Sequence, residues 1–207
     1  MAKRTAPEVN AGSMADIAFL LLIFFLVTTT IETDSGINRK LPPTDEVVDP
    51  PIIKERNIFT VVVNKNNQFL VEEEPMDIAN IRQAAIEFLD NGGGIGEEAC
   101  DYCKGERDRS SSDNPDKAII SLKNDRETDY KVYISVQNEL VAAYNELRNR
   151  EFIALYPNER MSFVEADKKY SDPRTSVKVK AALKLKLSVL KKMYPQKLSE
   201  AEPTKNN

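Results

Sequence analysis

The most apolar part of the chain lies near its N-terminus, at residues 13–31, where Asp16 is the only charged residue. As a helix, residues 14–31 would measure roughly 27 Å, close to the thickness of a bilayer core. The uninterrupted apolar stretch, residues 17–27, would also suit the hydrophobic part of a secretory signal. Asp16 at its edge and the lack of a clear Ala-x-Ala cleavage site favour a retained transmembrane helix at 13–31.

Polar sequence flanks this segment on both sides. Residues 1–12 form a short tail that contains Lys3 and Arg4, and two acids follow the apolar run. The positive-inside rule therefore places the N-terminus in the cytoplasm and the rest of the chain outside. Residues 32–57 carry four prolines and mixed charges without periodicity, which predicts an extended linker.

Strand-like and helix-like patterns alternate from residue 58 to residue 156, and turn clusters separate them. The predicted elements are strands at 58–63 and 68–71, a helix from Asp77 to Asn91, a strand at 118–122, a helix at 130–150 and a strand at 152–155. This β-β-α-β-α-β order predicts an α/β fold of two layers, with the helices on one face of a sheet.

Two segments fall outside this pattern. Residues 92–115 are rich in glycine, serine and acids, and we expect an irregular insertion there. Residues 157–207 are expected to form a C-terminal helical extension that the core does not need, with a helix at 175–194. The lysines of that helix fit either a solvated face or contact with an anionic surface.

The composition of the chain excludes several classes of enzyme and gives no sign of nucleic-acid binding. The chain has no histidine, which excludes His-based triads and zinc-hydrolase motifs and argues against an enzyme. A net charge of −4 gives no indication of nucleic-acid binding, which usually shows a basic excess. We therefore expect no catalytic residues and no cofactor.

Cys100 and Cys103 form a single C-x-x-C motif. Zinc sites usually need a second cysteine pair or histidines, so we expect no metal here. A thioredoxin-like motif would lie where a strand meets a helix, whereas this one lies in the irregular insertion. A local disulfide with a structural role is the preferred interpretation, because the positive-inside rule places this loop outside the cytoplasm, where disulfides persist.

Asp16 has two compatible interpretations. Ser13 and Asp16 fit a capping box, in which the helix dipole stabilises the charge. Alternatively, Asp16 is buried against a protein partner, where an apolar environment favours the protonated carboxyl and allows proton exchange. Residues of one helical face are expected to contact that partner: Asp16, Phe19, Leu20, Ile23, Val27 and Thr30.

Four hydroxyl side chains in the apolar segment, Ser13, Thr28, Thr29 and Thr30, are candidates for a proton path or for helix packing. Threonine hydroxyls near a helix end also commonly donate back to helix carbonyls. We favour this second role for the three threonines.

The residues around Asp16 resemble the N-terminal signature of the ExbD/TolR family. The resemblance runs from Val9-Asn-Ala-Gly-Ser-Met-Ala-Asp16 into Ile-Ala-Phe-Leu-Leu-Leu-Ile-Phe-Phe-Leu-Val-Thr. The linker, the β-β-α-β-α-β order and the segment Ile119-Ile-Ser-Leu-Lys-Asn-Asp125 before Tyr130 are also similar to that family. The resemblance covers residues 1–156, and the insertion and the C-terminal extension depart from the compact family pattern.

The resemblance implies an inner-membrane subunit of a proton-motive-force-driven motor that energises TonB-dependent outer-membrane transport. It implies a homodimer whose helices lie inside a pentamer of an ExbB/TolQ-like polytopic subunit, and a TonB-like partner in the periplasm. Asp16 would be the proton-carrying carboxylate. A TolR-like role in outer-membrane integrity and a passive membrane-anchored periplasmic binding domain are the alternatives.

Overall fold

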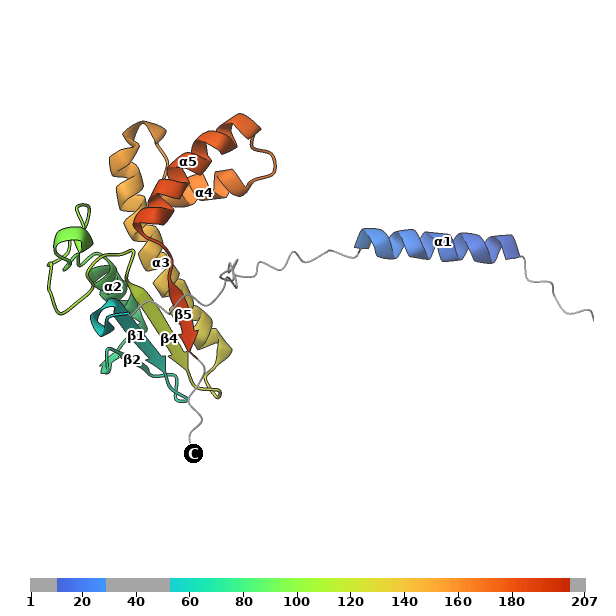
Figure 1. Ribbon diagram of the computed structural model, residues 1–207. Helices are drawn as coiled ribbons and strands as arrows, with labels where there is room; N and C mark the ends of the chain where they lie inside the picture. The colour runs from blue at the N-terminus through green and yellow to red at the C-terminus, as the bar shows by residue number, and fades with distance from the viewer. Residues whose placement is uncertain (1–10, 29–52, 202–207) are drawn as a thin grey trace, which may run out of the picture. The chain divides into compact units, whose positions relative to one another are not determined.

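The computed structural model describes residues 11–28 and 53–201 (Figure 1). The chain divides into two compact units, residues 1–49 and 50–207. The described part of the first unit is one helix, α1, Ala11–Thr28. It confirms a helix in the apolar segment, but residues 29–31 of that prediction and most of the predicted linker lie outside the described residues.

The second unit is built on a five-stranded sheet, with the strand order β3-β2-β1-β4-β5. The strands are β1 Ile58–Val63, β2 Phe69–Val71, β3 Glu74–Met76, β4 Ile119–Asn124 and β5 Leu198–Ala201. The hairpin pairs are antiparallel, whereas β4 lies parallel to both β1 and β5. The α/β prediction is therefore confirmed in its class, and the sheet is mixed.

Four α-helices accompany the sheet and its loops in this unit, besides three short 3-10 turns. The α-helices are α2 Ile78–Leu89, α3 Tyr130–Leu155, α4 Phe163–Ser171 and α5 Val177–Met193, and the 3-10 turns are Glu55–Asn57, Gly96–Glu98 and Pro157–Glu159. α2 and α3 lie together on one face of the sheet, as Figure 1 shows.

Alternation along β1 explains how the two layers meet. Phe59, Val61 and Val63 are buried against the helices, and the residues between them are only half-buried. This period of two is what a strand with one covered face requires. The helices supply the other half of the core at helical spacing: Ile81, Ala85, Phe88 and Leu89 from α2, and Val136, Leu140, Ala143, Tyr144 and Leu147 from α3.

The predicted strand at 152–155 is wrong, because these residues form the last turn of α3. A short apolar run cannot be told from the end of a buried helix by its pattern alone. Phe152 is fully buried and packs in a second cluster with Phe163, Leu183, Leu187 and Leu190. The helix ends at Leu155, two residues before a proline, as expected where proline restricts the residue preceding it.

The prediction that the core does not need the C-terminal extension is also wrong. α5 follows the predicted helix, but the chain then returns to the sheet and adds β5 beside β4. Tyr194, between α5 and β5, is fully buried in the main core. The sequence shows β5 only as a four-residue polar strand, Leu-Ser-Glu-Ala, which has no strong strand pattern.

The sequence analysis did not predict two further elements, β3 and α4. β3 follows β2 through Glu72 and Glu73, whose φ angles are positive, a conformation usually given to glycine or asparagine. α4 begins with a capping box, in which the Ser162 hydroxyl accepts from the Glu165 amide and the Glu165 carboxylate accepts from the Ser162 amide. That Ser-x-x-Glu signal was present in the sequence.

The packing of α5 predicts that its buried leucines stabilise the unit. Leu187 is 3% exposed in the second cluster, so Leu187→Ala should lower the free energy of unfolding by about 2–5 kcal/mol. Leu185 on the same helix is 71% exposed, and Leu185→Ala is the matched control, with a change below about 0.5 kcal/mol.

Urea unfolding of the full chain, followed by tyrosine fluorescence, measures both changes. All seven tyrosines lie between residues 102 and 194, so the signal reports on the second unit alone. Equal, small effects of the two substitutions would contradict the packing of α5.

Candidate functional site

Asp16 lies in the second turn of α1 and is the only charged residue of that helix. Its side chain is exposed, and so are the apolar side chains around it, including Met14, Ile17 and Leu20 at 58–61%. Phe19 and Ile23, which belong to the helical face predicted to meet a partner, are exposed as well. α1 therefore presents apolar surface with a single carboxylate.

The helix start changes how the charge of Asp16 can be stabilised. α1 already includes Ala11 and Gly12, so Ser13 lies inside the helix and the expected capping box is wrong. Alanine is the best helix former, and one glycine costs only about 1 kcal/mol, so the helix continues through both residues. The helix dipole acts mainly within the first turn, and Asp16 lies in the second turn.

The hydroxyl candidates cannot be judged from the described residues. Thr28 is the last residue of α1, its side chain and that of Ser13 lie outside the description, and Thr29 and Thr30 lie outside it altogether. Within residues 11–28 and 53–201, no helix is both long and apolar enough to cross a membrane.

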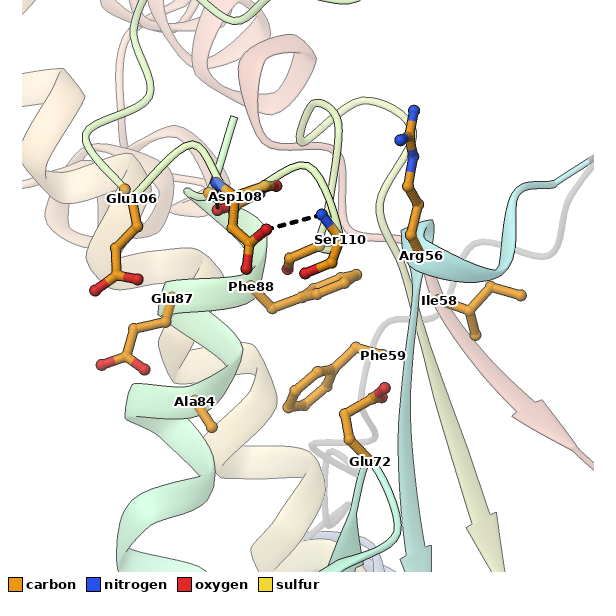
Figure 2. A pocket seen from close by; sticks show the side chains of 13 residues that line it. Arg56, Ile58, Phe59, Glu72, Ala84, Glu87, Phe88, Glu106, Asp108 and Ser110 are labelled. Carbon is orange, nitrogen blue, oxygen red and sulfur yellow. Dashed lines mark hydrogen bonds between the residues drawn. The ribbon is translucent and has the colours of Figure 1, made fainter. Parts of the chain in front are cut away.

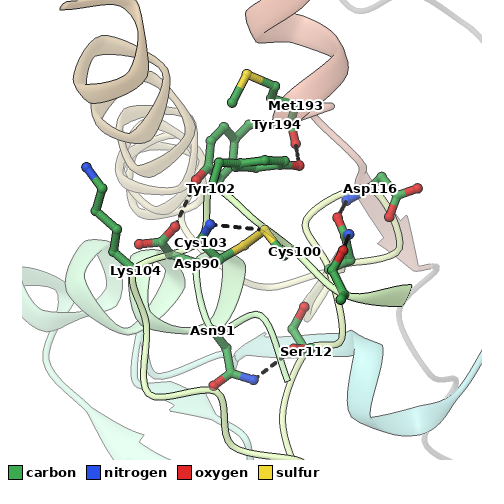
Figure 3. Close-up of a disulfide and its surroundings, with 12 residues drawn as sticks. Asp90, Asn91, Cys100, Tyr102, Cys103, Lys104, Ser112, Asp116, Met193 and Tyr194 are labelled. Carbon is green, nitrogen blue, oxygen red and sulfur yellow. Dashed lines mark hydrogen bonds between the residues drawn. A yellow bond between two sulfur atoms is a disulfide. The ribbon is translucent and has the colours of Figure 1, made fainter. Parts of the chain in front are cut away.

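In the second unit, Cys100 and Cys103 form a disulfide inside the insertion (Figure 3). Both cysteines are buried. Gly92, with φ +67°, lies against them, and a side-chain carbon there would come within 2.7 Å of Cys103 Cβ. The disulfide therefore packs on the end of α2, where only glycine fits.

Tyr102, between the two cysteines, connects this loop to the C-terminal extension. Its hydroxyl donates to the Met193 carbonyl at 2.7 Å, and its ring meets the Tyr194 ring edge-on, with centroids 5.4 Å apart. Burial raises the pKa of Tyr102 to about 12. The hydroxyl therefore stays protonated as a donor at neutral pH.

A buried ionic cluster lies beside this contact. Asp90, at the end of α2, accepts two hydrogen bonds from the Arg150 guanidinium at 2.6 and 2.8 Å. The Tyr194 hydroxyl donates to the same carboxylate at 2.8 Å, and burial raises its pKa above the ordinary value. Arg148 donates twice to the Tyr194 carbonyl. We call Asp90, Arg150 and Tyr194 the ionic cluster.

A second polar contact fixes the insertion to the start of β1. Asp113 is fully buried, and its carboxylate meets Arg56 at 2.6 Å and accepts from the Asn57 amide at 3.1 Å. Nearby, Lys117 and Lys54 lower the pKa of Glu98 to about 2. Because Asn57 is itself buried, the predicted linker, residues 32–57, extends too far at its C-terminal end.

A cavity of about 490 Å³ opens between β1, α2 and the insertion (Figure 2). Phe59 and Phe88 form its floor, and the carboxylates of Glu72, Glu87, Glu106 and Asp108 line its edge. In the described part of the chain, no group of three His, Cys, Asp or Glu residues could hold a metal ion. The polar residues that the sequence analysis missed, such as Asp90, Asp113 and Arg150, follow no periodicity that could have identified them.

Comparison with known proteins supplies a family. The model of the biopolymer transport protein ExbD/TolR family matches residues 2–149 of this chain. The chain is also 30% identical over 87 residues to biopolymer transport protein exbD2 of Vibrio cholerae. That similarity covers 42% of this chain and spans only 61% of the relative's length. The family match ends within α3, so α4, α5 and β5 lie beyond it.

The burial of the ionic cluster predicts that Asp90 contributes more to the free energy of unfolding than an aspartate that pairs with an exposed arginine. Asp90→Asn removes the carboxylate that binds the half-buried Arg150 at two points and leaves Arg150 paired with Glu151, and it should lower the free energy of unfolding by about 2–3 kcal/mol. The Asp172 carboxylate binds Arg174 in the same way, but the arginine is 90% exposed.

Asp172→Asn is therefore the matched control and should change stability by less than about 1 kcal/mol. Urea unfolding measured by tyrosine fluorescence compares the two variants. An Asp90 effect no larger than the Asp172 effect would show that the cluster is not a stabilising contact.

Proposed function

Since this chain belongs to the ExbD/TolR family of biopolymer transport proteins, we propose that it is the single-span inner-membrane subunit of a proton-driven motor. In this proposal, residues 13–31 cross the membrane with the N-terminus in the cytoplasm. The unit that follows lies in the periplasm, where the Cys100–Cys103 disulfide suits an oxidising compartment. The family is a component of transport and energy transduction, and we propose no enzymatic activity for this chain.

The observation that carries the proposal is the lone carboxylate of Asp16 in α1. A charged side chain at the centre of a membrane helix costs about 2.5–3.5 kcal/mol on insertion scales, and charges within such helices commonly mark functional sites. Its place beyond the first turn removes the simplest passive explanation, stabilisation by the helix dipole. This supports a functional carboxylate over a passive anchor.

The proposed mechanism requires a partner that surrounds α1. A homodimer of this chain, inside a pentamer of an ExbB/TolQ-like polytopic subunit, would shield the apolar side chains of α1 from water. In that setting, a proton entering from the periplasm would neutralise Asp16, and its release to the cytoplasm would restore the charge. One charge moved through 100 mV yields about 2.3 kcal/mol, so several protons can drive a rotation or shift of one subunit set against the other.

The periplasmic unit would deliver that movement to a TonB-like partner and so energise transport across the outer membrane. The exbD2 protein of Vibrio cholerae, to which the chain is similar, is a biopolymer transport protein by name. This likeness favours the transport role over the TolR-like role.

The decisive substitution is Asp16→Asn, which keeps the size of the side chain and removes its exchangeable proton. It should reduce proton-motive-force-dependent uptake through the outer membrane to background in cells without their own copy. Asp16→Glu should retain part of the activity, and Asp34→Asn, the same change outside α1, should have no effect.

Detergent copurification with the polytopic subunit is measured alongside uptake, because it separates loss of proton transfer from loss of assembly. The proposal expects normal assembly of Asp16→Asn. Normal uptake by an assembled Asp16→Asn complex would refute it. Normal uptake with increased leakage of the outer membrane in a deletion strain would instead support the TolR-like role.

A further inference from the structure

The cavity of about 490 Å³ in the second unit has walls from three separate parts of the chain (Figure 2). Arg56, Ile58 and Phe59 belong to the start of β1 and the turn before it, and residues 84–91 belong to α2 and its end. The third wall is residues 105–111 of the insertion, directly after the disulfide. The volume lies within the usual range for ligand pockets.

The floor of this cavity is aromatic. The rings of Phe59 and Phe88 lie 5.1 Å apart, and both side chains are more than nine-tenths buried. Ala84 of α2 also lines the cavity and is half-buried. An apolar group of a ligand would be removed from water on this floor.

The rim of the cavity is acidic. It carries four exposed carboxylates, Glu72, Glu87, Glu106 and Asp108. Three of them are held in place: Asp108 accepts from the Ser110 amide at 2.8 Å, Glu87 from Gln83 at 2.9 Å, and Glu72 from the Thr60 amide. The Ser110 hydrogen bonds also keep the pKa of Asp108 below its usual range.

Arg56 is the only basic residue that lines the cavity, and its guanidinium is paired with Asp113. Its guanidinium lies 2.6 Å from the buried Asp113 carboxylate and donates to the Arg109 carbonyl at 3.0 Å. The carboxylates of the rim therefore face the cavity without a cation of the lining to neutralise them. Such a rim attracts cationic groups and repels anionic ones.

We propose that this cavity binds an extended peptide segment in which a lysine or arginine neighbours an apolar side chain. The apolar side chain lies on Phe59 and Phe88, and the cationic group reaches the carboxylates of Glu87 and Glu106. The acidic rim of a second copy of this chain would be repelled by the carboxylates of this site, so that rim is not the expected occupant. The site is separate from Asp16, so its failure leaves the proton-transfer proposal untouched.

A dye-labelled acetyl-Lys-Leu-Lys-amide tests the site with the full chain in uncharged detergent micelles, by fluorescence anisotropy. This peptide should bind at least about tenfold more tightly than acetyl-Glu-Leu-Glu-amide, because the rim favours one charge sign. Acetyl-Lys-Gly-Lys-amide should bind more weakly than the leucine peptide, since it lacks the group that covers the floor.

The double variant Glu87→Gln/Glu106→Gln should weaken binding of acetyl-Lys-Leu-Lys-amide about tenfold, as expected when two attractive charges are removed. Glu127→Gln/Glu146→Gln changes the net charge equally at two exposed sites outside the cavity and should leave binding unchanged. Equal losses in the two double variants, or equal affinity for the lysine and glutamate peptides, would overturn the proposal.

Discussion

The fold of the second unit depends on the buried contact among Asp90, Arg150 and Tyr194. Each residue comes from a different part of the chain: the end of α2, the last turns of α3 and the end of α5. Asp90 is buried and Arg150 is half-buried, and a carboxylate at that depth without its arginine costs free energy. The three segments are therefore stable only when they pack together. Because Tyr194 precedes β5, this contact also decides where the fifth strand joins the sheet.

The same contact links the core to the insertion. Tyr102 packs on Tyr194 and donates to the Met193 carbonyl. The disulfide between the cysteines that flank Tyr102 in the sequence packs against Gly92 and fixes the loop there. The residues that follow the disulfide form one wall of the acidic cavity. The insertion thus contributes both to stability and to the proposed peptide site. The proposed proton chemistry belongs to α1.

The sequence predicted those features that follow a period. The hairpin at 58–71, α2, α5 and the apolar helix with Asp16 all appear where regular spacing placed them. The strand at 152–155 failed because four apolar residues fit the end of a helix equally well. Asp90, Arg150 and Asp113 could not be predicted, because the partners that place them are 44 to 104 residues away and no local pattern encodes such pairs. The short polar strand β5 depends likewise on Tyr194.

The central claim is that Asp16 takes up and releases protons within an assembled membrane complex. Infrared difference spectroscopy of that complex in a lipid bilayer, recorded as the pH is changed, measures this directly. The account predicts a protonated-carboxyl C=O band that rises as the pH falls in the wild type and is missing from Asp16→Asn. Identical difference spectra for the two proteins would contradict it.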